Sequence, residues 1–238
     1  MIDPFVNVVT QLNNLMGNLG ATIILIALVS RIIFYPLTKS SIKQSQKMRD
    51  MKPKLDELKK KYGNDRKKMA EEQAKLYRES GVNAAGCLAP LVQLVIAVVL
   101  FQVLLRFLNS GIDTKFLVWD LAKPDVYDIE GLFFKIPGIL VVATALATFI
   151  QSKMMQPAAS ENVPKNSAQK QDFSDVLSQS QGQLVYMFPL IILFTGTIFP
   201  AGLALFWTVS TIIAIIQQYQ IAGLGGLEPW LKRIQKKG

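Results

Sequence analysis

Histidine is absent from the 238 residues, and cysteine occurs only once, at Cys87. Without histidine the chain cannot build a zinc-binding HExxH motif, a Ser-His hydrolytic site or a histidine proton relay. A single cysteine excludes disulfides within the chain and any cysteine-rich metal site. The long apolar runs also contain no Asp or Glu, which excludes the paired aspartates of an intramembrane protease. We therefore predict that the protein is not an enzyme, requires no cofactor and binds no metal.

What the chain does contain is apolar sequence, at 50% hydrophobic residues and a mean hydropathy of +0.29. Five apolar runs are candidate membrane spans. They lie at 20–38, 86–108, 136–156, 184–199 and 202–221. The last two come from one run that is too long for a single helix, and the residues Phe199-Pro200-Ala201-Gly202 supply the break. The predicted fold class is all-α: a polytopic membrane protein with five transmembrane helices.

The segments between these runs differ sharply in charge. Residues 1–19 have helical apolar spacing and no Lys or Arg, which predicts an amphipathic surface helix and no charged start of a signal peptide. Residues 39–84 are rich in both charges, and a stop at Gly63-Asn64-Asp65 predicts a two-helix hairpin, with Pro53 kinking its first helix. Segment 109–135 is an acidic loop, 157–182 is a polar linker, and 223–238 is a short basic tail.

The formal net charge of +9 is concentrated in the hairpin and the tail, so direct nucleic-acid recognition is not the first inference. Five spans place these two basic segments on one side of the membrane and the N-terminal segment with the acidic loop on the other. Cytoplasmic segments carry the excess of Lys and Arg. We expect a multi-pass protein of the inner or plasma membrane, with its N-terminus outside and its C-terminus in the cytoplasm.

Arg31 lies inside the first run, roughly 10 Å from the polar boundary near Lys39. A guanidinium near the centre of a lipid-facing helix costs from about 2.5 to more than 10 kcal/mol. One interpretation is that its long side chain reaches the nearer headgroups. The other is that Arg31 faces a polar cavity between helices, which agrees with the polar side chains of the other runs.

Six further residues in the runs are candidates for the lining of such a cavity. They are Gln93, Gln151, Trp207, Ser210, Thr211 and Gln217. The simpler role for the polar ones is hydrogen bonding between helices, at about 0.6 kcal/mol per pair. Gln151 could instead mark the end of its helix, and Trp207 could be an interfacial anchor.

Several blocks of sequence, in this order, resemble the YidC/Oxa/Alb family of membrane protein insertases in its five-span form. They are Arg31 with Pro36-Leu37, then SQKMRDMKPKLDELKKKYGND, LYRESGVNAAGCLAPLVQ, FIQSKM and MFPLIILFTGTIFPAGLALFWTVSTIIAIIQQYQI. Together they span almost the whole chain, from Ala21 to Ile221.

The resemblance implies a helical insertase and chaperone with a hydrophilic groove that is open to the cytoplasm and to lipid. Arg31, Gln151 and Trp207 stand at the positions of groove residues, and the hairpin 39–84 at that of the substrate-receiving hairpin. The implied partners are nascent membrane proteins and the lipid bilayer. The ribosome, the signal recognition pathway and the Sec translocon are further candidate partners.

The alternative function is a transporter or channel in which Arg31 binds an anion. That class predicts a path through the membrane and often repeated halves, and the asymmetric chain with its large basic hairpin indicates neither. A purely structural scaffold is a third possibility that residues alone leave open.

Overall fold

The computed structural model describes residues 3–62, 65–81, 88–107, 113–128, 131, 135–156 and 185–235, and these are mostly helical. The helices are α1 (Asp3–Met16), α2 (Leu19–Ile33), α3 (Tyr35–Tyr62), α4 (Arg66–Glu79), α5 (Leu88–Phe107), α6 (Ile139–Met155), the helix Val185–Thr195, α8 (Ala201–Ala222) and α9 (Leu227–Gln235). Strand β1 (Lys115–Phe116) pairs with β2 (Trp119–Asp120), and β3 (Val126–Tyr127) pairs with β4 (Ile136–Pro137). The predicted linker 157–182 and the helix stop at Gly63-Asn64 fall outside the described residues.

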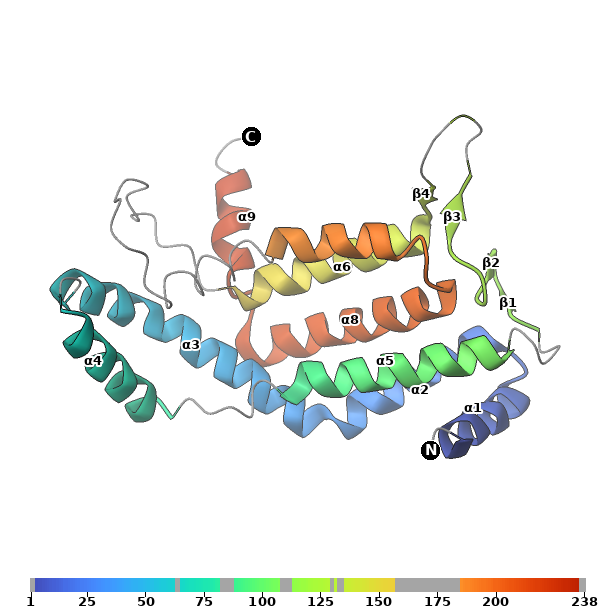
Figure 1. The fold of residues 1–238 in the computed structure, drawn as a ribbon, viewed down its shortest axis with the longest axis horizontal. Coiled ribbons are helices and arrows are strands. Elements are labelled where there is room, and N and C mark those ends of the chain that lie inside the picture. The colour runs from blue at the N-terminus through green and yellow to red at the C-terminus, as the bar shows by residue number, and fades with distance from the viewer. Residues whose placement is uncertain are drawn as a thin grey trace.

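Helix α8 is the centre of the bundle. It packs mainly against α6 and α2, and it also contacts α5 and α3. In Figure 1, α8 lies between α6 on one side and α2 with α5 on the other. The four short strands and α1 gather at one end of the bundle, which we call the loop end. Helices α3, α4 and α9 extend from the opposite end, which we call the basic end.

Three helices of the bundle, α2, α6 and α8, run in the same direction. Gly20, near the start of α2, packs against the Phe116 ring of β1. The backbone N–H of Gly202, in the first turn of α8, donates to the carbonyl of Leu121 at 2.9 Å. The backbone N–H of Leu140, in the first turn of α6, donates to the Asp125 carboxylate at 2.7 Å. Helices α2, α6 and α8 therefore all start at the loop end and run in parallel toward the basic end.

The first predicted span, 20–38, is not one straight helix. Asn18 caps the start of α2 by accepting a hydrogen bond from the Ala21 N–H at 3.0 Å. The helix ends at Ile33, and α3 begins at Tyr35 with its axis turned by 66°. Pro36 explains the break, because it has no N–H for the carbonyl of Ile32, whereas a proline in the first turn of a new helix is tolerated.

Helix α3 has two different parts. Its first part belongs to the bundle, since Ile42 and Met51 are only 5% and 4% exposed. Beyond Met51 the helix runs without a break through Pro53, and it packs against α4, where Met69 is buried. The predicted hairpin 39–84 thus includes about three helical turns that the structure packs against the bundle.

The predicted break near Pro200 occurs, although the helix before it is shorter than the run 184–199. The helix Val185–Thr195, the unlabelled orange ribbon beside α6 in Figure 1, stops at Thr195. Residues 196–199 form a turn in which the Thr197 hydroxyl donates to the Phe194 carbonyl at 2.7 Å. Pro200 then stands at the N-cap of α8, where the missing N–H costs nothing.

Among the described residues, one helix is both long and apolar enough to cross a bilayer by itself: α8, with 22 residues. The bent pair α2 and α3 would add a second span. The apolar stretches Gln93–Arg106, Ile139–Met155 and Val185–Thr195 are shorter than the usual length of about 20 residues. The five-span count therefore stays a prediction.

Candidate functional site

The main apolar cluster lies in the half of the bundle nearest the loop end, while separate buried apolar side chains such as Met154 and Ala214 lie nearer the basic end. Helix α8 contributes only residues between 201 and 206, and α2 only residues between 19 and 27. The buried members of the core are Val9, Leu19, Ile23, Ala27, Ala97, Leu100, Val103, Leu104, Leu121, Leu140, Ala201, Leu203, Leu205 and Phe206. This packing, together with the loop residues 113–128 at the same end, closes the loop-end half of the bundle.

Asp125 holds the start of α6 to the loop. Its carboxylate accepts hydrogen bonds from the backbone N–H groups of Leu140 at 2.7 Å and Val141 at 3.3 Å, and from the Trp119 indole at 3.1 Å. These backbone donors are among the four that a helix leaves unpaired at its start, and an anion there also complements the helix dipole. Gly138 is required beside it, because a Cβ at that position would overlap the Asp125 carboxylate.

The start of α8 is held by the same loop. The backbone N–H of Ala201 donates to the Lys123 carbonyl at 2.7 Å, next to the bond between Gly202 and Leu121. Asp120 orders this segment by accepting a hydrogen bond from the Thr114 hydroxyl at 2.7 Å and pairing with Lys123 at 3.0 Å. The Thr114 hydroxyl, followed by Lys123 and a backbone N–H, holds the pKa of the Asp120 carboxyl below its ordinary value. The loop thus fixes the relative positions of α6 and α8.

Arg31 and Ser210 lie at the same depth in the bundle. Gly202 packs against Ile23 where α8 meets α2. Arg31 follows Ile23 by eight residues, and Ser210 follows Gly202 by eight, so in parallel helices both lie about 12 Å deeper. Thr148 of α6 reaches a similar depth, because it is one turn beyond Thr144, which contacts Thr208 of α8. Polar groups from α2, α6 and α8 therefore lie at a similar depth along the bundle, on the basic-end side of the main apolar cluster. We call this depth the polar level.

At and below this level, buried polar atoms lack partners among the described residues. The atoms are Arg31 Nε, Thr148 Oγ1, Ser210 Oγ, Gln217 Oε1 and Gln218 Oε1. One turn nearer the loop end, the Thr144 and Thr208 hydroxyls lie 2.6 Å apart, so one can donate to the other while the second donates to a carbonyl of its own helix. An unpaired buried polar atom costs about 1–3 kcal/mol, so these five atoms are the ones that would gain most from water or a polar ligand.

Two of the predicted residues, Arg31 and Gln93, line one small cavity. Its other lining residues are Ser30, Phe34, Leu37, Thr38 and Ile96, so it lies at the bend between α2 and α3 and faces α5. The cavity measures about 20 Å³, which is room for about one water molecule. In this structure the surroundings of Arg31 are therefore narrow, with polar and apolar side chains mixed.

The remaining predicted residues are not part of that cavity. Ser210 and Gln217 are both buried in α8 and are seven residues apart, so they share one face of the helix. Thr211 is buried beside them. The Trp207 ring packs against Phe188 of the helix Val185–Thr195, with 6.4 Å between ring centres. Gln151 is half-buried near the end of α6.

Sequence reasoning did not single out Thr148, Gln218 or Asp125. The first two carry unpaired polar atoms, and Gln218 follows Thr211 at the same seven-residue spacing that links Ser210 to Gln217. That spacing is visible in the sequence and could have identified Gln218. Asp125 gave no such signal, because its role depends on a contact with residues 15 and 16 positions away.

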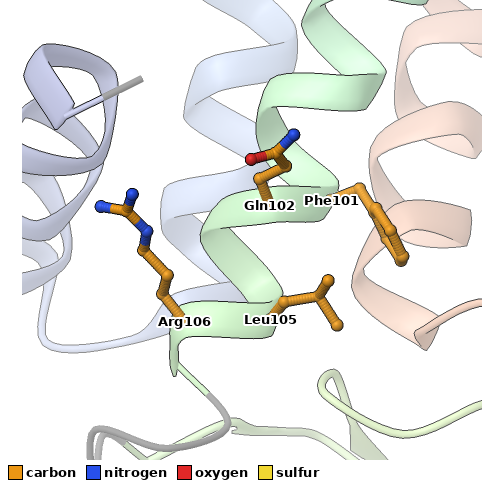
Figure 2. A pocket seen from close by; sticks show the side chains of 4 residues that line it. All are labelled: Phe101, Gln102, Leu105 and Arg106. Carbon is orange, nitrogen blue, oxygen red and sulfur yellow. The ribbon is translucent and has the colours of Figure 1, made fainter. Parts of the chain in front are cut away.

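A second, larger hollow lies on the surface of α5 and is separate from this polar level. It measures about 450 Å³ and is lined by Phe101, Gln102, Leu105 and Arg106. Figure 2 shows that Arg106 and Phe101 project from α5 in opposite directions. Phe101 packs edge-on against Phe199 at 5.6 Å between ring centres, and Arg106 lies exposed near the loop end of the helix. None of the four residues that line this hollow lines the Arg31 cavity.

Comparison with known proteins identifies the family. The family model described as 60Kd inner membrane protein matches residues 11–224, which is most of the chain. The chain belongs to this family. A curated relative in Fusobacterium nucleatum subsp. nucleatum, named membrane protein insertase YidC, is 35% identical over 213 residues, which is 88% of this chain and 88% of the relative. The resemblance to the YidC/Oxa/Alb family inferred from the sequence is confirmed.

Some other relatives are much longer than this chain. A relative of the same name in Shewanella woodyi is 32% identical over 225 residues, which is 93% of this chain but 36% of the relative. A crystal structure described as an active YidC insertase, with its first transmembrane domain resolved, is 27% identical with a TM-score of 0.60. The match covers 92% of this chain and 45% of that one. The family places this chain in a membrane, as the apolar runs predict.

Proposed function

We propose that this protein is a membrane protein insertase, which receives hydrophobic polypeptides at its basic end and releases them sideways into the bilayer. The names of its relatives support this activity. The observation that carries the proposal is the division of the bundle into two halves. The loop-end half has a closed apolar core, whereas the other half holds Arg31 and four further buried polar atoms without partners among the described residues.

This division suits the physical task of insertion. Each charged residue of a substrate tail costs about 2.5–3.5 kcal/mol or more at the centre of the bilayer. A groove that admits water from one side to the level of Arg31 would shorten the apolar distance that the tail must cross. The guanidinium would also attract acidic residues of the tail more strongly than in bulk water, because its surroundings are less polarisable. The apolar segment of the substrate would then leave into lipid by its own partitioning.

The proposed groove is lined by Arg31, Gln93, Gln151, Ser210 and Gln217, with Thr211 and Trp207 beside it. The cavity of about 20 Å³ at Arg31 would be its closed form, which widens as water or substrate enters. We further propose that five spans cross the membrane, with the loop end outside and the basic end in the cytoplasm. The charge difference between the two ends supports this orientation.

A transporter with Arg31 as an anion site is a weaker explanation. Transport requires a polar path that reaches both surfaces, at least in alternation. The buried core at the loop end is apolar in the part of the chain that the structure describes, and hydrogen bonds tie the loop to the starts of α6 and α8. These contacts favour a site that is closed on one side.

The test is reconstitution of the purified protein into liposomes, followed by synthesis of a small double-span substrate and protease protection of its translocated loop. Protection well above that of empty liposomes is expected. For substitutions of Arg31 in the same assay, Arg106→Gln is the matched control, since it removes another span arginine that lies outside the Arg31 cavity. If the protein gives no more protection than empty liposomes, the insertase proposal is wrong.

A further inference from the structure

The end of α6 is fixed by contacts from two other parts of the chain. The Met154 carbonyl accepts a hydrogen bond from Arg49 Nη1 of α3 at 3.2 Å. It also accepts one from the backbone N–H of Gly226 at 3.4 Å, in the turn between α8 and α9. The last carbonyls of a helix have no partner within the helix and carry partial negative charge, so a cation is favourable there. Arg49 thus acts as a C-terminal cap for a helix other than its own.

The turn beside Arg49 has no room for side chains. Gly225 has a φ of +56°, and a Cβ there would overlap both Arg49 Nη1 and the Met154 carbonyl. A Cβ on Gly226 would lie 2.5 Å from the Gln156 carbonyl and 2.7 Å from the Lys153 carbonyl. The α8–α9 turn, the end of α6 and the Arg49 guanidinium therefore form one closely packed contact.

Arg49 lies where α3 changes its surroundings. It precedes Met51, which is buried, and Pro53, which is exposed at the start of the part that packs with α4. Because Pro53 has no N–H, the carbonyl of Arg49 lacks its usual helical partner, so the helix has one hydrogen bond fewer at this point. A movement of the distal part of α3 with α4 would therefore act first on Arg49.

We propose that Arg49 is a positioning residue that couples the outer part of α3 and α4 to the end of α6. Through the Met154 carbonyl it sets the distance between α3 and the half of α6 that carries Thr148 and Gln151. Engagement of a substrate by α3 and α4 would then displace α6 and widen the polar level beside it. The consequence for insertion rests on the proposed function, whereas the structural coupling does not.

Distance measurement tests the coupling without any insertion assay. Spin labels would replace Lys60, exposed on the outer part of α3, and Leu146, which is 59% exposed on α6, in a cysteine-free background in lipid nanodiscs. Pulsed electron paramagnetic resonance should give one narrow distance distribution. Arg49→Met keeps much of the side-chain volume but removes the charge and the donor. We expect it to broaden the distribution. Losing a charge-assisted hydrogen bond shifts the equilibrium between the contact's closed and open forms about tenfold.

Two further variants separate a specific contact from a general loss of structure. Arg49→Lys keeps a cation and a donor, so it should restore most of the narrow distribution. Lys43→Ala removes an exposed cation from the same helix and should leave the distribution unchanged. An unchanged distribution in Arg49→Met, or equal broadening in Lys43→Ala, would refute the coupling.

The insertion assay then tests the consequence. Arg49→Met should lower insertion about three- to tenfold, with Arg49→Lys close to the unmodified protein. Lower insertion with an unchanged distance distribution would overturn the positioning role. If the unmodified protein inserts nothing, the proposed function fails, but the distance measurements still decide whether Arg49 couples α3 to α6.

Discussion

Replacement of Asp125 by alanine should be among the most destabilising single changes in the chain. The side chain is 9% exposed and accepts three hydrogen bonds, two of them from backbone N–H groups that α6 cannot pair itself. Hydrogen bonds to a charged group contribute about 1.5–3 kcal/mol each, and they are not fully additive. Allowing for water that enters the vacated space, we expect a loss of about 4 kcal/mol in the free energy of unfolding.

The assay is thermal unfolding in detergent, followed by tryptophan fluorescence. For a chain of this size, about 4 kcal/mol corresponds to a fall of roughly 8–16 °C in Tm. Asp125→Asn keeps one acceptor oxygen and should lose less. Asp128→Ala is the matched control, because Asp128 is exposed and pairs only loosely with Lys135, at 3.6 Å, among the described residues. A Tm for Asp125→Ala within 2 °C or so of the Asp128→Ala value would refute the reasoning.

Three further predictions concern the polar level and the topology. Arg31→Ala should fold normally but impair insertion of substrates with acidic tails more than neutral ones, while Arg31→Lys retains much activity; equal losses for both substrates would exclude electrostatic attraction. Thr148→Val should change the free energy of unfolding by less than about 1 kcal/mol, because the hydroxyl has no partner among the described residues, whereas Thr144→Val should lower Tm clearly. Similar effects of the two changes would contradict the pairing of Thr144. A single cysteine at Ser45 should be shielded from an impermeant thiol reagent in intact cells and one at Ser110 should react; the reverse pattern would invert the topology.

The sequence was sufficient for the helical class and for the family. Apolar runs, an embedded arginine and ordered sequence blocks are local features, and each can be read without knowing which helices touch. The structure brings two of the predicted groove residues, Arg31 and Gln93, to one narrow cavity. The groove lining and the five-span count stay predictions.

The bend at Phe34 was missed for a physical reason. Hydropathy sums side-chain properties along the chain and does not register backbone hydrogen bonds, so the apolar run 20–38 looked continuous. Pro36 was the available sign, since a proline interrupts the helix on its N-terminal side. The same limit hid the first part of α3, where apolar residues such as Ile42 and Met51 are spaced among many charges but are buried against the bundle.

Long-range capping was beyond the sequence altogether. Asp125 looked like one of several loop acids, and Arg49 like one of many basic residues between 39 and 84, yet each caps an end of α6. The two caps have the signs that the helix dipole favours, negative at the start and positive at the end. Both come from segments outside α6, so the position of this short apolar helix is set at each end by a different part of the chain. A helix held in this way can shift at one end while the other stays fixed. That is the movement a site closed at the loop end and widening at the basic end would require.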